Sequence, residues 1–545
     1  MFCNKKNVNI LTSLLIAHGV RKAVVCPGSR NAPIVHNLNE SPEISCYPVT
    51  DERSAGFYAL GIALADDNPV AVCVTSGSAL LNLAPAVAEA CYRGCGIIVI
   101  SADRPAAWID QLDGQTLPQH DAFGRFTACS VTLPEPSDDE ECWYCNRLIN
   151  EALSAVRLRG HKPVHINVPI SEPLFEFNTP LLPNERKITI LPTAFNEDAF
   201  RRNVADRLFA AGRPMIVVGQ TGKADEDFER ALKTVSTRFT VLAESLASES
   251  HSPFETVLAE AEDDASLLPD CLLYMGGTLV SKRLKKFLRR GKDTETWAVS
   301  PDGDVHDTFM NLVGVIEGDC LTAMNILADE VERRTKSGNR EDAGNPGALD
   351  YAKEWSMLLG RAADKISARE PEYSADGVVR EFEMSLEDMD YNYHVHYANS
   401  TAVRLANVHS GHYVWCNRGV NGIEGSLSTA AGFSLATGDM VFCVIGDLSF
   451  FYDQNALWNS NIGGNLRIIL LNNGGGGIFY GLPGLKESAA CDRLVAGRHE
   501  TTAQGICTQC DAGYLSAHDM TELHIGLATL MTAETARPMV LEVFL

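Results

Sequence analysis

The residues best suited to chemistry lie near the C-terminal end of the chain, where two apolar runs each end in polar side chains. The run 440–445 is followed by Gly446-Asp447-Leu448-Ser449, and the run 466–471 is followed by Asn473 and the glycines 474–477. Carboxylate and amide oxygens are hard ligands that suit magnesium. Glycines beside them let backbone amides approach phosphate oxygens. The pattern therefore predicts a site for a magnesium ion and a diphosphate group.

A second candidate group is the carboxylate of Glu52, in segment 48–56, where a predicted strand turns into a predicted helix. Acids are common in the first turn of a helix because the helix dipole favours them. Taken alone, Glu52 would be interpreted as a solvated carboxylate.

Short apolar runs predict the strands that would position these residues. In the first third of the chain they fall at 22–26, 44–49, 70–74, 97–100 and 164–168, with helices at 51–65 and 78–91. Further runs fall at 214–219, 240–243, 271–276 and 296–299, and then at 393–397, 440–445, 466–471 and 539–544. Continuous apolarity indicates strands covered on both faces, and so parallel sheets between helices.

Two polar segments, 178–192 and 335–346, are the predicted linkers between domains. We therefore expect an α/β fold of three consecutive doubly wound parallel-sheet domains, at 1–178, 193–334 and 347–545. A chain of 545 residues is long enough for about three or four domains.

Composition excludes several classes of partner. With 46 basic and 70 acidic residues, the net charge of −24 would repel nucleic acids and anionic membranes. An anionic substrate must then be bound by a local cluster of arginines. No apolar run approaches the roughly 20 residues of a membrane helix, and the N-terminus does not resemble a signal peptide. The 16 scattered cysteines indicate free thiols in a reducing compartment, so we expect a cytoplasmic protein.

Two alternative sites follow from local spacing. Cys142 with Cys145 and Cys507 with Cys510 form two Cys-x-x-Cys pairs, which together could bind zinc. The pairs lie far apart in sequence and lack glycine-rich knuckles, so we regard their spacing as chance. The segment 219–222 of the middle domain, Gly-Gln-Thr-Gly, could belong to a dinucleotide-binding domain but lacks the GxGxxG spacing.

The Gly-Asp and Asn-Asn pair, at its spacing, resembles the thiamine-diphosphate motif. Several other segments resemble the 2-succinyl-5-enolpyruvyl-6-hydroxy-3-cyclohexene-1-carboxylate synthase family of menaquinone biosynthesis. These segments lie at 26–33, 51–63, 75–79, 101–105, 113–116 and 417–425, and the similarity extends across all three predicted domains. The resemblance implies the architecture of pyruvate-oxidase-like and decarboxylase-like enzymes, with pyrimidine-binding, central and diphosphate-binding domains in this order.

The resemblance also implies the binding of thiamine diphosphate with Mg²⁺ or Mn²⁺. Glu52 would contact N1′ of the aminopyrimidine and act as the catalytic residue, and Ile423 would support the bent cofactor. Other cofactor contacts would come from Thr75, Gly446, Asp447, Leu448, Ser449, Asn473, Gly475, Ile478 and Phe479. Asp447, Asn473 and the carbonyl of Gly475 would bind the metal.

In this family, 2-oxoglutarate is decarboxylated and the resulting succinyl-semialdehyde carbanion adds to isochorismate. Two such acids require several cationic side chains, and the planar guanidinium of arginine fits carboxylates best. The implied substrate-binding residues are Arg30, Arg104, Gln115, Lys282, Arg283, Ser400, Arg404 and Arg418. The family further implies a homodimer or homotetramer with the active site at a subunit interface.

Three other functions stay open at this point. Another thiamine-diphosphate carboligase or decarboxylase, such as an acetolactate-synthase-like enzyme, would need fewer cationic residues. A non-catalytic cofactor-binding protein is disfavoured because Glu52, Asp447 and Asn473 are all present. The third is a flavin- or nicotinamide-dependent oxidoreductase built on the middle domain.

Overall fold

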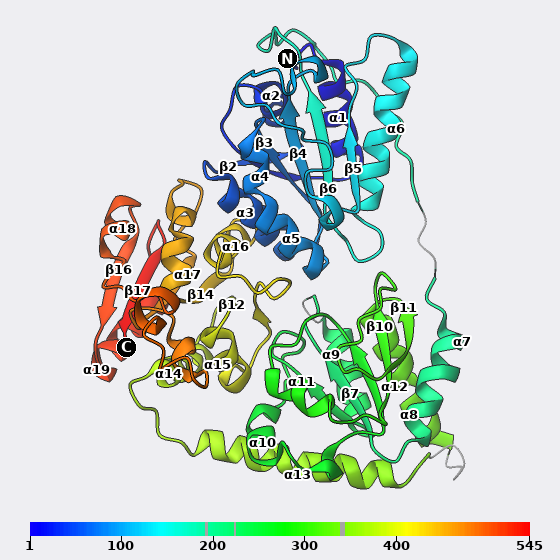
Figure 1. The fold of residues 1–545 in the computed structure, drawn as a ribbon, viewed down its shortest axis with the longest axis vertical. Helices are drawn as coiled ribbons and strands as arrows, with labels where there is room; N and C mark the ends of the chain where they lie inside the picture. The colour runs from blue at the N-terminus through cyan, green and yellow to red at the C-terminus, as the bar shows by residue number, and fades with distance from the viewer. Residues whose placement is uncertain (191–193, 223–224, 338–343) are drawn as a thin grey trace. The chain divides into compact units, whose positions relative to one another are not determined.

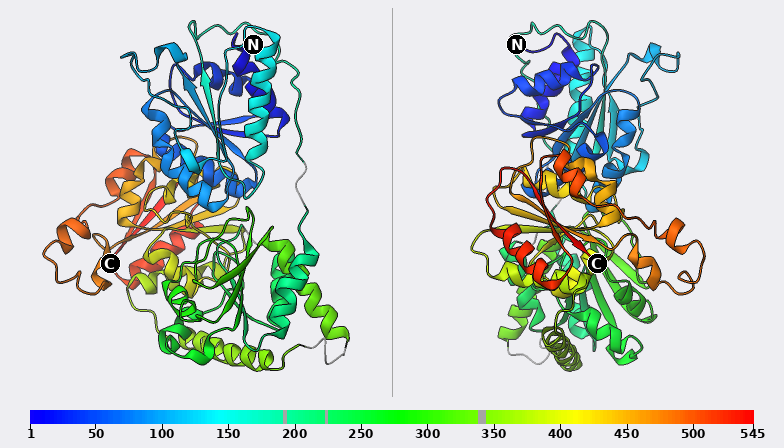
Figure 2. Two further views of the ribbon diagram at one scale, coloured as in Figure 1. Left: turned by 45° about the vertical axis from the view of Figure 1, so that its right-hand side comes forward. Right: turned by 90° about the vertical axis from the view of Figure 1, so that its left-hand side faces the viewer.

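The computed structural model describes residues 1–190, 194–222, 225–337 and 344–545 (Figure 1). Within them lie three sheets whose paired strands run parallel, with helices on both faces (Figures 1 and 2). The expected α/β class with three parallel sheets is confirmed. Parts of both predicted linkers, residues 191–193 and 338–343, lie outside the described residues, and the domain limits stay a prediction.

The chain forms two compact units. The first holds the described residues up to 190 together with 390–399 and 417–545, and therefore most of two sheets. The second holds the described residues of 194–389 together with 400–416.

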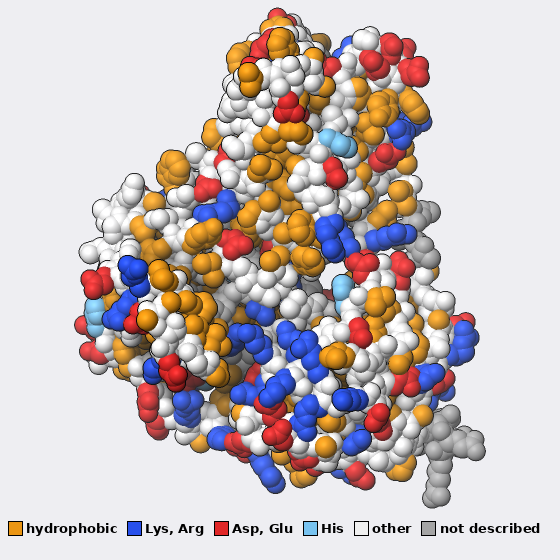
Figure 3. Space-filling view, viewed as in Figure 1, with side chains coloured by type: hydrophobic (Ala, Val, Ile, Leu, Met, Phe, Trp, Pro, Cys, Tyr) orange, Lys and Arg blue, Asp and Glu red, His pale blue; other side chains and the backbone are white. Residues whose placement is uncertain are grey.

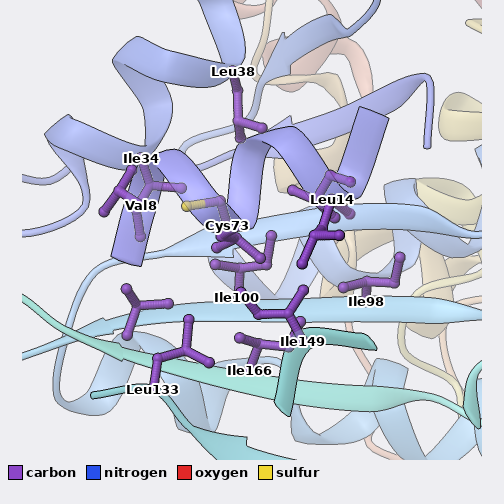
Figure 4. Close-up of a cluster of buried hydrophobic side chains, with 14 of the residues drawn as sticks. Val8, Leu14, Ile34, Leu38, Cys73, Ile98, Ile100, Leu133, Ile149 and Ile166 are labelled. Carbon is purple, nitrogen blue, oxygen red and sulfur yellow. The ribbon is translucent and has the colours of Figure 1, made fainter. Parts of the chain in front are cut away.

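The first sheet has the strand order β2-β1-β3-β4-β6-β5. Its strands are β1 (Lys22–Val25), β2 (Ser45–Pro48), β3 (Val70–Val74), β4 (Ile97–Asp103), β5 (Cys129–Thr132) and β6 (Val164–Pro169). The surrounding helices are α1 (Lys6–Ala17), α2 (Ala32–Glu40), α3 (Glu52–Asp66), α4 (Ser78–Asn82), α5 (Ala84–Arg93) and α6 (Asp139–Ala155). Buried side chains of α1, α2 and α6 pack on the strands in one cluster that includes Leu14, Ile100 and Ile149 (Figure 4).

In another sheet of the first unit, five strands lie side by side in the order β12-β14-β15-β17-β16. They are β12 (Tyr393–Tyr397), β14 (Met440–Gly446), β15 (Leu466–Asn472), β16 (Gly513–Ala517) and β17 (Met539–Phe544). The helices around them are α16 (Ser426–Ser434), α17 (Asp447–Tyr452), α18 (Gln504–Gln509) and α19 (Met520–Thr532). A 3-10 helical turn, η6 (Gly477–Gly481), follows β15.

The second unit contains a sheet of order β11-β10-β9-β7-β8. Its strands are β7 (Pro214–Val218), β8 (Thr240–Ala243), β9 (Cys271–Met275), β10 (Glu295–Ser300) and β11 (Leu312–Glu317), and the short β13 (Val414–Trp415) lies later in the chain. Its helices are α7 (Glu197–Phe200), α8 (Asp206–Ala210), α9 (Glu226–Ser236), α10 (Phe254–Ala261), α11 (Lys282–Leu288), α12 (Cys320–Ser337), α13 (Gly347–Ser367), α14 (Ala375–Glu387) and α15 (Thr401–His409).

Helices α3 and α16 pack against each other at unusually short range within the first unit. A Cβ atom added to Gly61 of α3 would lie 2.0 Å from the carbonyl oxygen of Thr429, and one on Gly432 of α16 would lie 2.2 Å from that of Tyr58. The Tyr58 hydroxyl also donates to the carbonyl of Ala456 at 2.6 Å. Because glycine has no side chain, the helix that begins at Glu52 can pack closely on α16, which lies beside β14.

One predicted helix is wrong in detail: the segment 78–91 forms two helices, α4 and α5, that meet at Leu83. Pro85 lies in the first turn of α5, where the missing N–H is tolerated, and it cannot continue α4. In the described part of the chain, no helix is long and apolar enough to cross a membrane. All 16 cysteines are free thiols.

Candidate active site

Asp447 and Asn473 come together because β14 and β15 are adjacent parallel strands. Gly446 is opposite Leu471 in their register, so the residues that follow both strands emerge at one edge of the sheet. Asp447 is only 3% exposed, and its Oδ1 atom accepts a hydrogen bond of 2.6 Å from the backbone N–H of Leu448. The sequence prediction that these two side chains lie together is therefore correct.

Three polar groups converge at this edge. One terminal atom of the Asn473 amide lies 3.1 Å from the Oδ2 atom of Asp447 and 2.6 Å from the carbonyl oxygen of Gly475. With NH₂ at this position, the amide donates a hydrogen bond to both oxygens. With its oxygen at this position, the amide would complete a set of three oxygen ligands around a divalent cation. The donor set, one carboxylate, one amide and one carbonyl, fits Mg²⁺.

The glycine loop gives Gly475 the conformation that this set requires. Its φ of +149° favours glycine, and a Cβ atom there would lie 2.9 Å from the carbonyl oxygen of Ala496. The N–H of Gly475 donates to Asp447 Oδ2 at 2.9 Å, while Gly476 donates to Ala496 at 2.7 Å. The loop is thus fixed to Asp447 on one side and to segment 496–499 on the other.

The remaining predicted diphosphate contacts surround this edge. Gly446 ends β14, and Leu448 and the buried Ser449 lie in the first turn of α17. Ile478 and Phe479 lie in η6 and are half-buried. Their contacts with a cofactor stay a prediction.

Glu52 is the first residue of α3, as predicted. Asp51 caps this helix by accepting hydrogen bonds from the N–H groups of Arg53, at 2.9 Å, and Ser54, at 3.3 Å. The half-buried Glu52 carboxylate accepts a hydrogen bond of 3.2 Å from the side chain of Asn82, at the end of α4. The cap and this hydrogen bond hold the Glu52 side chain at the edge of the first sheet where the strands end.

Both neighbours of Glu52 reach the C-terminal end of α17 or the residues just after it. The side chain of Asn455 donates to Asp51 Oδ2 at 2.7 Å. Arg53 donates to the carbonyl of Tyr452 at 2.7 Å, and its guanidinium lies 4.4 Å from the centre of the Tyr452 ring. The start of α3 is therefore held by the C-terminal end of α17 and by Asn455 just beyond it.

Of the predicted substrate-binding residues in the first unit, two arginines already have anionic neighbours. Arg30 is buried, donates to the carbonyl of Ile170 at 2.8 Å and lies 3.0 Å from the exposed carboxylate of Glu172. Arg104 lies 3.4 Å from Asp113. Each of the two guanidinium groups is thus paired with an exposed carboxylate.

A buried polar network beneath these loops was not predicted from the sequence. The side chain of Gln119 accepts from the N–H of Gly77 at 2.7 Å and donates to Asn167 at 2.8 Å. Asn167 in turn donates to Asp103 at 2.8 Å, and burial raises the pKa of the Asp103 carboxyl group. The network links the turn after the buried Thr75 to the end of β4, beside Arg104.

The loop that carries Arg418 and Ile423 is held by a second unpredicted residue, Glu89 of α5. The buried Glu89 carboxylate accepts hydrogen bonds from the N–H groups of Gly419, at 2.7 Å, and Val420, at 2.6 Å. Burial raises the pKa of Glu89, while these two amides and nearby arginines act in the opposite direction. Arg418 is buried and donates to Asn399 at 3.1 Å, whereas Ile423 is 42% exposed.

The other four predicted substrate-binding residues belong to the second unit. Lys282 and Arg283 begin α11, over which Lys and Arg side chains gather in Figure 3. Arg283 forms an ion pair with Glu255 at 2.9 Å. Ser400 has a φ of +77° and immediately precedes α15, while Arg404 lies in the first turn of that helix. Ser400 therefore lies just outside the helix, where its side chain makes no capping hydrogen bond, and it does not share a regular helical face with Arg404.

The predicted residues thus fall into separate groups. Arg30, Glu52, Thr75, Arg104 and Gln115 follow strands or begin helices around the first sheet, and the metal and diphosphate candidates lie at the ends of β14 and β15. No hydrogen bond or ion pair joins Glu52 to Asp447 in the described parts of the chain.

The cysteine pairs do not form a zinc site. Among the residues that the structure describes, the one group of at least three clustered His, Cys, Asp or Glu ligand atoms is Asp302, Asp304 and His306. Cys145 and Cys507 are buried, and burial raises their thiol pKa values, that of Cys507 to about 12. These thiols are packed as small apolar side chains.

Comparison with known proteins assigns the chain to a family. A family model described as the thiamine pyrophosphate enzyme N-terminal TPP binding domain matches residues 6–124. A Bacteroides fragilis protein named 2-succinyl-5-enolpyruvyl-6-hydroxy-3-cyclohexene-1-carboxylate synthase is 43% identical over 100% of this chain and 97% of its own length. The chain belongs to this synthase family.

Other members of the synthase family are similar over nearly the whole chain. The Phocaeicola vulgatus synthase is 42% identical over 100% of this chain and 96% of its own length. The Flavobacterium johnsoniae synthase is 34% identical over 97% of this chain and 94% of its own length. The family predicted from the sequence is confirmed, and the chain is a thiamine-diphosphate-dependent enzyme.

Proposed function

We propose that this synthase family member decarboxylates 2-oxoglutarate and joins the remaining four carbons to isochorismate. The products would be 2-succinyl-5-enolpyruvyl-6-hydroxy-3-cyclohexene-1-carboxylate and CO₂. The observation that supports this most directly is the convergence of the Asp447 carboxylate, the Asn473 amide and the Gly475 carbonyl group beside a glycine loop. Such a set suits a magnesium ion that carries a diphosphate.

Bound thiamine diphosphate supplies a carbon nucleophile for the 2-oxo group and accepts the electron pair released with CO₂. Glu52 holds a proton at the N1′ atom of the cofactor. Asn82 donates to Glu52 Oε2, which leaves Oε1 for that contact. Since Ile423 is half exposed, a cofactor contact accounts for this apolar side chain better than core packing does.

The cationic side chains bind and orient the two acids. Arg30 and Arg104 would exchange their exposed carboxylate neighbours for substrate carboxylates, to which a guanidinium can donate two parallel hydrogen bonds. Arg418, which Asn399 orients, would meet the same substrates. Gln115, Lys282, Arg283, Ser400 and Arg404 complete the proposed set.

We further propose that the enzyme works in the cytoplasm as a homodimer or homotetramer. Its 16 free thiols support a reducing compartment. The oligomer would place Glu52 of one subunit opposite the Asp447 site of another.

The direct test is consumption of isochorismate by purified protein with thiamine diphosphate, Mg²⁺ and 2-oxoglutarate, leaving out each component in turn. We expect consumption that requires all of them and one CO₂ per isochorismate. Release of CO₂ from 2-oxoglutarate without loss of isochorismate would contradict the proposed acceptor. Release of CO₂ from pyruvate instead would favour an acetolactate-synthase-like activity.

A further inference from the structure

The ring of His499 lies beside the predicted metal ligand Asp447. Its Nε2 atom is 3.5 Å from Asp447 Oδ2, and the side chain is 17% exposed. His499 follows the glycine-rich segment by about two dozen residues and lies in none of the motifs that suggested the family.

The hydrogen bonds of the ring determine where its proton lies. The N–H of Thr501 donates to Nδ1 at 3.1 Å, so Nδ1 carries no proton and Nε2–H is the donor of the neutral ring. Nε2 is buried and forms no hydrogen bond with any described residue. A buried donor in this state has a desolvation cost, so it is expected to find an acceptor.

The position of the ring is fixed from two sides. The backbone N–H of His499 donates to the carbonyl of Gly474 at 3.0 Å. The ring packs edge-to-face on Phe451 of α17, with 5.3 Å between ring centres and 88° between planes. Phe451 and Gly474 belong to the two elements that carry Asp447 and Asn473, so His499 bridges both.

We propose that His499 is a positioning residue of the metal site, a role that rests on the proposed function. Its Nε2–H closes onto Asp447 Oδ2 when the ion is bound and fixes the plane of the carboxylate. The N–H groups of Leu448 and Gly475 already hold the two oxygens of Asp447. The imidazole supplies a third, directional donor, as outer ligands do in other metal sites.

The test is a calorimetric titration of Mg²⁺ into protein that has been stripped of metal and cofactor and then given a fixed excess of thiamine diphosphate. We expect His499→Ala to raise the half-saturating Mg²⁺ concentration by about 10-fold or more. Gln places an NH₂ near the Nε2 position, so His499→Gln should recover much of the loss. Asn can replace only Nδ1 as acceptor for Thr501, so His499→Asn should behave like Ala.

The control is His518→Ala, because the exposed His518 ring stacks on Phe544 and does not contact Asp447. Unfolding temperatures without cofactor should be equal for all variants. Unchanged Mg²⁺ midpoints in His499→Ala, or recovery by Asn but not by Gln, would overturn the proposed role. If the wild-type protein itself bound no thiamine diphosphate with Mg²⁺, the proposed function would be wrong. This result differs from the one that contradicts only the role of His499, in which wild type and variant bind Mg²⁺ equally well.

Discussion

At the residue scale, Glu52 is the side chain on which the proposed reaction depends most. Glu52→Gln keeps an oxygen that can accept from Asn82, so the fold around α3 should be unchanged. The amide cannot hold and release a proton at N1′. We expect turnover to fall by about 10²- to 10⁴-fold, the usual range for an acid–base group. Rates at saturating cofactor, with circular dichroism as the folding control, test this, and near-normal turnover would remove Glu52 from the reaction.

A substitution at Ile423 distinguishes a contact with the cofactor from ordinary packing. Because the side chain is 42% exposed, Ile423→Ala should change the free energy of unfolding by no more than about 1 kcal/mol. If the side chain supports the cofactor, the same variant should lose at least about 10-fold in turnover, which corresponds to roughly 1.4 kcal/mol of transition-state free energy. Full activity per folded molecule would show that Ile423 has no such role.

At the scale of elements, the crossing of α3 and α16 depends on Gly61. The Cβ of Gly61→Ala would have to displace the backbone of α16, since it falls 2.0 Å from the Thr429 carbonyl oxygen. We expect a loss of about 1–3 kcal/mol in unfolding free energy, as in other overpacked sites. Gly505→Ala, in α18 of the same unit, is the matched control because its Cβ has open space. Thermal unfolding of both variants measures this difference. Equal stability of the Gly61→Ala and Gly505→Ala proteins would contradict the close helix crossing.

Asp453 connects the end of α17 to α16 and makes that contact pH-dependent. Its carboxylate accepts from the N–H and the hydroxyl of Ser428, both at 2.7 Å, and burial raises its pKa from 3.8 to about 6. A raised folded-state pKa means that the folded state binds the proton more tightly. The stabilising contribution is therefore full below pH 4 and is lost as the pH rises through about 6.

Asp453→Asn tests this dependence because the amide can both accept from Ser428 N–H and donate to its hydroxyl. The unfolding free energy of the variant relative to wild type should rise by about 2 kcal/mol between pH 4 and pH 7. Chemical denaturation at several pH values gives this difference. A difference that did not vary with pH would show that Asp453 has an ordinary pKa.

At the scale of the whole molecule, the sequence predicted most of the strands and missed several at the edges of the sheets. Continuous apolar runs identified β3, β9 and β15, which are buried along their whole length. The edge strands β2 and β8 were also predicted, whereas the edge strands β5, β11 and β16 were not. Apolar periodicity reports burial, so it is a weaker signal for β5, β11 and β16, whose residues are mostly half-buried or exposed.

The same limit applies to the site. The family motifs indicated Asp447 and Asn473 because their separation along the chain is characteristic. Glu89 gave no such signal, since it holds Gly419 from 330 residues away. Gln119 and His499 likewise act through partners that only the folded chain brings near, and residues of this kind are found by their burial and hydrogen bonds.

The proposed assembly leads to a test that uses two inactive variants. If each active site combines Glu52 of one subunit with Asp447 of another, a hybrid of Glu52→Gln and Asp447→Ala subunits has one site with both defects and one intact site. Co-expression with two different affinity tags would yield this hybrid. Its activity should be about half that of a wild-type dimer, although each variant alone is nearly inactive.

A site built within one chain predicts the opposite, because every site in the hybrid would then carry one defect. Two tagged Glu52→Gln subunits, purified in the same way, provide the matched control. Recovery in the hybrid alone would assign the active site to the interface, and equal inactivity in both preparations would place each site within a single subunit. Since a shared site requires association, an active monomer at high dilution would also contradict the proposed interface.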